Sequence, residues 1–144
     1  MTAADVQALV DVARTHAFAE AAAYLETTLA TLDDDPVYEL QPIGRVLRGA
    51  DRARRYYDYF FAHFMPLTAG FELRNEWVTD EGVGQEYTIW LRLPDGSRER
   101  HDVIGILLFG RQGKLAGERL YASDRLLGLM FGPLLQELEP LEGE

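Results

Sequence analysis

The spacing of the apolar residues changes near Gly70, and that change limits the folds that the chain can adopt. Before Gly70 most apolar residues recur at helical spacing, and from Gly70 to about residue 123 they alternate with polar residues, which is typical of strands. Helices followed by a run of strands indicate an α+β domain, in which helices cover one face of an antiparallel sheet.

Apolar residues at helical spacing predict helices over residues 5–14, 18–32, 50–64 and 125–138. Alternation predicts strands over residues 37–40, 45–47, 71–79, 84–93, 98–109 and 115–123. A break is expected near His16, and Pro36 ends the second helix because proline cannot continue the hydrogen-bond ladder. Pro94–Ser97 is a tight-turn sequence that joins two strands as a hairpin. A curved sheet wrapped over a long helix leaves a cone, and a small-molecule pocket is expected at its mouth.

The 144 residues suit one domain, 1–144, and a hydrophobic share of 47% is enough to form a buried core. The acidic end of the chain, residues 137–144, is expected to be disordered. The net charge of −10 disfavours nucleic acid and anionic membranes as partners, because both attract positive surfaces. No apolar run approaches the roughly 20 residues of a membrane span and no signal peptide is visible, so a cytoplasmic protein is expected.

Several segments resemble one known group of proteins: Asp35–Glu39 before Gly49, Val103–Ile106, Gly113–Leu115, and the strand through Arg119 and Tyr121. In these segments the chain resembles the nuclear transport factor 2-like (NTF2-like) superfamily, and within it the SnoaL-like polyketide cyclases and limonene epoxide hydrolases. The resemblance covers nearly the whole chain. It implies a cystatin-like cone, with N-terminal helices packed on a curved sheet of four to six mostly antiparallel strands, and a C-terminal helix. It also implies a homodimer.

The catalytic residues of these relatives are missing. The Arg-x-Asp pair of the epoxide hydrolases and the Asp on their last strand fall on Glu86, Thr88 and Leu120, and the cyclases place their catalytic Asp at Leu120 too. Tyr38 matches the tyrosine that positions water in the hydrolases, but its asparagine partner falls on Leu40. Hydrolysis of limonene-like epoxides is therefore not expected, because no carboxylate remains to activate water.

The resemblance and the alternation along each strand together predict which side chains face the cone. Four of them can move protons when burial tunes them, and they form the predicted catalytic set: His101 as the base, with Glu86, Glu118 and Tyr38. The predicted ligand-binding set is Trp90, Thr88, Leu40, Val103, Leu120, Asp35 and Phe60. Two alternatives remain open, because His101 could simply bond a neighbouring carboxylate and the glutamates could pair with arginines. No metal site is expected, since His16 and His63 have no spacing that pairs them as ligands.

Two functions are consistent with this pattern. The first is a cofactor-free lyase, isomerase or cyclase that acts on a hydrophobic carbonyl compound by acid–base catalysis. The second is a non-catalytic ligand-binding or structural dimer module. The dimer is expected to form through the convex face of the sheet, whose predicted apolar residues are Ile104, Ile106, Leu108, Tyr87, Ile89, Leu91 and Tyr121. Alternatively, the C-terminal helix folds over this face within one chain.

Overall fold

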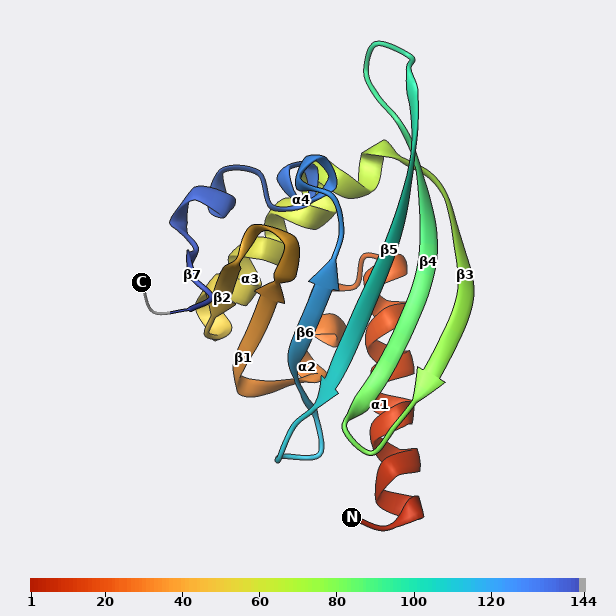
Figure 1. Ribbon diagram of the computed structural model, residues 1–144, viewed down its shortest axis with the longest axis vertical. Helices are drawn as coiled ribbons and strands as arrows, with labels where there is room; N and C mark the ends of the chain where they lie inside the picture. Colours follow the sequence, from red (N-terminus) through yellow and green to blue (C-terminus); the bar gives the residue numbers. More distant parts are fainter. Residues whose placement is uncertain (143–144) are drawn as a thin grey trace.

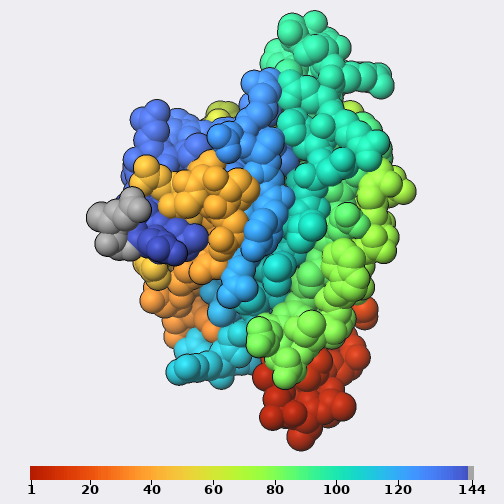
Figure 2. All heavy atoms as spheres, viewed as in Figure 1, coloured from red at the N-terminus to blue at the C-terminus, as the bar shows by residue number. Residues whose placement is uncertain are grey.

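One curved sheet has helices on one of its faces, and its other face is open, as Figures 1 and 2 show. The computed structural model describes residues 1–142. The strands are β1 (Leu32–Leu40), β2 (Arg45–Arg48), β3 (Thr68–Val78), β4 (Gly82–Arg92), β5 (Arg98–Phe109), β6 (Leu115–Tyr121) and β7 (Glu139–Pro140). Their order in the sheet is β3-β4-β5-β6-β1-β2-β7, and every neighbouring pair is antiparallel except β1 and β6. The α+β cone is confirmed, although the sheet has more strands than expected because the chain end adds β7.

The helices are α1 (Ala3–Ala21), α2 (Leu25–Ala30), α3 (Ala50–Tyr59) and α4 (Asp124–Phe131). Thr2 and Asp5 form a capping box at the start of α1, which satisfies backbone N–H groups that the first turn leaves free. The break predicted near His16 is wrong: α1 continues through it, and the chain turns instead at Ala23, whose φ is 60°. His16 is buried on the same face as Leu9 and Ala13, so it extends their stripe.

The third helix does not continue as an α-helix to residue 64 as predicted. After Tyr59 the chain forms a π-helical turn, Phe60–Phe64, and then a 3-10 turn, Met65–Leu67. Single π turns inside helices are rare and occur often at functional sites. Phe60 and Phe64 are both buried, and their rings stack with centroids 5.0 Å apart. This turn therefore presents two aromatic rings to the interior beside the sheet.

The core lies between the helices and the concave face of the sheet. α4 packs against α3 on this side, because Phe131 stacks on Tyr56 with ring centroids 4.1 Å apart. The alternative in which the C-terminal helix covers the convex face is therefore wrong. In Figure 2 the strands form the front surface, with β1 and β2 on the left and β6 to β3 towards the right, and the N-terminal helix is visible at the lower and right margins.

Residues 137–140 form a short strand and ion pairs where disorder was expected. Glu139–Pro140 form β7, in which Glu139 pairs with Val46 of β2. The carboxylate of Glu137 lies 2.7 Å from the guanidinium of Arg55, and that of Glu139 lies 3.2 Å from Arg52. The prediction of a disordered tail is thus corrected for residues 137–140, and residues 143–144 lie outside the described part. Between residues 1 and 142, no helix has both the length and the apolar composition that crossing a bilayer requires.

Candidate functional site

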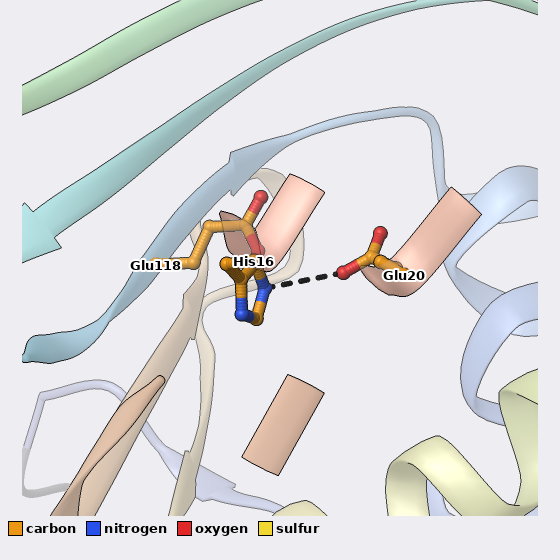
Figure 3. A group of neighbouring side chains, drawn as sticks. All are labelled: His16, Glu20 and Glu118. Atoms are coloured by element: carbon orange, nitrogen blue, oxygen red, sulfur yellow. Dashed lines mark ion pairs between the residues drawn. The ribbon is translucent and has the colours of Figure 1, made fainter. Parts of the chain in front are cut away.

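A cavity of about 330 Å³ lies between α1, the π turn and the concave face of the sheet. Most of its lining is apolar, as the side chains of Phe60, Phe64, Met65, Ile89, Leu107 and Met130 show. Three of its ionisable side chains, His16, Glu20 and Glu118, meet at one place (Figure 3), and Tyr87 is a fourth ionisable residue of the lining. An apolar hollow of this size with a few convergent polar groups is typical of small-molecule sites.

Glu118 extends from β6 into this cavity and is nine-tenths buried. Its carboxyl makes no side-chain hydrogen bond within residues 1–142, and its oxygens are open to the cavity rather than fully enclosed. Gly105 on β5 makes room for it, because a Cβ there would lie 2.5 Å from Oε1 of Glu118. Burial, and then the charge of Glu20, raise the pKa of Glu118 well above its usual value. Burial and the charge of Glu20 therefore favour the protonated form of this carboxyl, whose O–H is a hydrogen-bond donor that faces the cavity.

His16 extends from α1 and is held in one orientation. Its Nδ1 lies 2.7 Å from Oγ1 of Thr31, and the Thr31 hydroxyl donates to the carbonyl of Thr28 at 2.6 Å. Since the proton of Thr31 is committed to that carbonyl, Nδ1 of His16 is the donor in the first bond. The neutral ring then has a lone pair on Nε2, which lies 3.3 Å from Oε2 of Glu20. Figure 3 shows His16 and Glu118 close together, with Glu20 joined to the ring by this contact.

Two tyrosines lie behind this pair. The hydroxyl of Tyr57 lies 3.1 Å from Oε2 of Glu20 and 3.2 Å from Nε2 of His16. The hydroxyl of Tyr38 lies 2.5 Å from that of Tyr57. Burial raises the pKa of both tyrosines well above the usual value, so both keep their protons.

His16, Glu20 and Glu118 are also the side chains that come nearest to a metal site, since their ligand atoms lie within 4.8 Å of one another. Nε2 of His16 and Oε2 of Glu20 lie 3.3 Å apart, a separation that also suits two ligands of one tetrahedral zinc ion. The hydroxyl of Tyr57 contacts these same two atoms, so in the described residues they belong to one hydrogen-bonded group.

Two of the predicted site residues, Glu118 and Phe60, line the cavity. Tyr38 does not line it but reaches His16 and Glu20 through the hydroxyl of Tyr57. Three further predicted residues are buried in the core beside the cavity without lining it: Leu40, Val103 and Leu120. Asp35 is exposed on β1 and lies outside the cavity lining.

His101 does not belong to this site. It lies on β5 outside the cavity lining, and its Nε2 is 2.9 Å from Oε1 of Glu99. Glu99 also binds Arg125 of α4 at 2.7 Å, and the bonds from Arg125 and His101 lower its pKa to about 2. The alternative in which His101 simply bonds a neighbouring carboxylate is therefore the one that the structure has.

The predicted orientation of β4 is wrong by one residue. Arg92 pairs with Arg98 and Ile89 with His101, with no bulge between them, so odd-numbered residues of both strands share a face. The β4 side chains that line the cavity are accordingly Gln85, Tyr87 and Ile89. The predicted inward set, Glu86, Thr88 and Trp90, lies on the opposite face, and the predicted outward set, Tyr87, Ile89 and Leu91, lies on the inner face.

On that opposite face the polar members of β4 have partners. Thr88 is buried, accepts a hydrogen bond from Arg74 at 2.6 Å and donates one to Asp102 at 2.7 Å. Glu86 accepts from Asn75 at 2.6 Å. Neither residue lines the cavity. The observed orientation of β4 places no arginine or aspartate in the cavity lining either.

Sequence reasoning missed His16, Glu20 and Tyr57. A signal for the first two was present, because residues four apart on a helix lie on the same face. Tyr57 has the helical spacing of a core residue, and it is fully buried, but its hydroxyl makes it part of the site.

No protein-family model and no curated protein matches the sequence. Solved structures do match. An NTF2-like protein of unknown function from Burkholderia xenovorans is 24% identical, with a TM-score of 0.64 over 82% of this chain and 84% of that chain. An NTF2-like protein from Anabaena variabilis is 18% identical, with a TM-score of 0.66 over 86% of this chain and 94% of that chain. A Silicibacter pomeroyi protein with a cystatin-like fold is 9% identical, with a TM-score of 0.64 over 83% and 79%. The chain therefore has the NTF2-like, cystatin-like fold.

Proposed function

We propose that this is a pocket protein of the SnoaL-like type, which binds a small, largely apolar carbonyl compound and moves a proton on it by cofactor-free acid–base catalysis. The observation that carries this proposal is Glu118, a buried and unpartnered carboxyl beside the His16–Glu20 pair in an otherwise apolar cavity. Isomerisation, elimination and aldol-type cyclisation of a carbonyl compound can each begin with such a proton transfer.

Glu118 acts as the acid. Its O–H donates to the carbonyl oxygen of the ligand, where negative charge develops when a neighbouring C–H bond breaks. The cavity offers the ligand no arginine or lysine. The remaining donors of the lining are neutral, among them Tyr87 and Gln85. Of these neutral groups a protonated carboxyl is the strongest acid, and the low polarity around it strengthens its hydrogen bond to this charge.

The His16–Glu20 pair acts as the base. Nε2 of His16 takes the proton from the carbon next to the carbonyl, and the electrons of that C–H bond form a carbon–carbon double bond. The carbonyl oxygen takes the proton of Glu118, which yields an enol. Glu20 then faces the charged imidazolium at 3.3 Å and stabilises it. In a ligand with a conjugated double bond, His16 returns its proton to the far carbon and the enol O–H returns its proton to Glu118, which completes an isomerisation. Where a leaving group stands on the next carbon, it departs with the proton of His16 while the enol O–H returns its proton to Glu118, which completes an elimination.

Deuterium exchange tests this proposal without knowledge of the natural substrate. In D2O, the protein is expected to speed the loss of the α-proton NMR signals of apolar ketones such as benzylacetone. Glu118→Gln and His16→Gln should each slow the exchange at least about tenfold, because a positioned acid or base contributes that much or more. His101→Gln is the matched control and should exchange at the wild-type rate, since His101 lies outside the cavity lining.

Exchange that is unaffected by Glu118→Gln contradicts the assigned acid. Exchange that responds to added Zn²⁺ or to a chelator points instead to a metal at the same three side chains. Thermal stabilisation by the ketones without any exchange supports the non-catalytic binding module.

The second function, a structural dimer module, is favoured by the open convex face. Trp77, Ile104 and Tyr121 are respectively 50%, 38% and 44% exposed, although large apolar side chains are seldom so exposed in groups. A second copy of the chain would bury this face by two-fold symmetry.

We expect light scattering to give about twice the chain mass of 16.3 kDa. Ile106→Glu should yield monomers, because an unpaired charge in a dry interface is costly. Phe18→Glu changes an exposed apolar residue on α1, in the opposite layer, and should leave the dimer intact. A wild-type mass near that of one chain at micromolar concentration rules this interface out.

A further inference from the structure

Two buried hydroxyls determine where one proton lies. Within residues 1–142, the hydroxyl of Tyr38 has a single hydrogen-bond partner, the hydroxyl of Tyr57 at 2.5 Å, and both side chains are almost fully buried. If Tyr57 donated in this bond, the proton of Tyr38 would have no acceptor, which costs about 1–3 kcal/mol in a buried site. Tyr38 is therefore the donor, and Tyr57 keeps its own proton for another acceptor.

That proton has two acceptors at nearly equal distance. Oε2 of Glu20 lies 3.1 Å from the Tyr57 hydroxyl, and Nε2 of His16 lies 3.2 Å from it. The other ring nitrogen of His16 is already bound to Thr31 at 2.7 Å, so the ring cannot turn away without losing that bond. One hydroxyl proton is thus placed between the two atoms that form the proposed base.

We infer that Tyr57, oriented by Tyr38, selects which of His16 and Glu20 accepts the proton of the ligand, an inference that rests on the proposed function. When Tyr57 donates to Glu20, the lone pair of His16 is free to accept. When Tyr57 donates to His16, the carboxylate of Glu20 is free instead. Once Nε2 of His16 has taken a proton, the hydroxyl of Tyr57 turns to Glu20. Tyr57 is accordingly a positioning residue, since it acts through the base and does not line the cavity.

NMR of isotope-labelled histidine in the full, ligand-free chain tests the proton arrangement directly. The neutral ring of His16 is expected to have its proton on Nδ1. Tyr57→Phe should move the Nε2 resonance towards that of a nitrogen without a hydrogen bond. Tyr38→Phe should move the Nε2 resonance by a smaller amount, because the hydroxyl of Tyr57 remains but no longer accepts a hydrogen bond from Tyr38.

Tyr56→Phe is the matched control, since Tyr56 is buried on the same helix and makes no hydrogen bond to His16 or Glu20 within residues 1–142. It should leave the His16 resonances unchanged. A neutral His16 with its proton on Nε2, or an Nε2 resonance that Tyr57→Phe does not move, overturns the inference.

Benzylacetone exchange separates this inference from the function on which it rests. Tyr57→Phe is expected to lower the exchange rate about tenfold and to change its pH profile, while thermal melting shows whether the variant is folded. An unchanged pH profile in folded Tyr57→Phe overturns the selection of the base. If the wild-type protein gives no exchange while the NMR shifts appear as expected, the proposed function fails and the proton arrangement stands.

Discussion

Alanine in place of Gly117 is expected to destabilise the protein by about 3 kcal/mol or more. Gly117 has a φ of 143°, a conformation that residues with a side chain rarely adopt. It pairs with Val37 where β6 runs parallel to β1, and a Cβ at this position would overlap the carbonyl oxygen of Val37. The two strands would have to separate, and chemical denaturation measures the resulting loss of stability.

Gly128→Ala is the control for this prediction. Gly128 lies inside α4, and a Cβ there would meet nothing within 4 Å. Alanine is a better helix former than glycine, so this variant should gain up to about 1 kcal/mol. If Gly117→Ala is as stable as the wild type, the parallel pairing that places Tyr38 beside Glu118 is wrong.

Glu118→Gln is expected to make the protein more stable at neutral and alkaline pH. The pKa of Glu118 is raised in the folded state above the usual value of 4.5, first by burial and then by Glu20. Between these two pKa values the folded chain binds the proton more tightly than the unfolded chain, so wild-type stability falls as the pH rises. The fall is about 1.4 kcal/mol for each unit by which the pKa is raised, and glutamine removes it because it does not titrate.

Thermal melting between about pH 5 and pH 9 measures this effect, and the wild-type and Glu118→Gln curves should diverge as the pH rises. Glu99 provides a comparison of opposite sign. The pKa of Glu99 is lowered to about 2 in the folded chain. The stability that the ionised Glu99 contributes is therefore fully present above its usual pKa of 4.5, and it is lost as the pH falls towards 2. Glu99→Gln should therefore lose stability relative to the wild type at neutral pH. Parallel curves for Glu118→Gln and the wild type contradict the buried, protonated state of Glu118.

The fold could be predicted from local patterns. Pro94–Ser97 marks the hairpin between β4 and β5, and the predicted bounds of β5, residues 98–109, are those of the structure. The resemblance and the alternation along β1 and β6 together place Tyr38 and Glu118 on the inner face, where the structure has them. The hairpin and the bounds of β5 could be predicted because they depend on neighbours in the sequence.

The orientation of β4 was predicted wrongly because even-numbered residues of β4 and odd-numbered residues of β5 were placed on the same face, which the hairpin between these strands does not allow. A hairpin without a bulge that pairs Arg92 with Arg98 places Ile89 opposite His101, so these two residues share a face. An inward His101 is therefore incompatible with an inward Thr88. The number of residues in the turn is enough to reveal this conflict from the sequence.

Other parts of the site depend on distant contacts that no local pattern contains. A break in the helix was expected near His16, yet the side chain of His16 is buried and its Nδ1 is hydrogen-bonded to the hydroxyl of Thr31, which follows α2. The role of Tyr57 depends on Tyr38, which approaches from β1. The high pKa of Glu118 results from the packing of the whole cavity around it, which strand alternation alone does not predict.

The π turn at Phe60–Phe64 has a consequence for how this protein could diverge. A π turn holds one residue more than an α turn, so it is equivalent to an insertion that the helix has absorbed. Deleting the exposed Ala62 would restore a regular helical turn and remove the bulge, while the residues after the turn would keep nearly the same direction around the helix axis. The wall of the cavity would then change while the sheet and Glu118 stayed in place. A single codon gained or lost in this helix is thus a direct evolutionary route to a new ligand size.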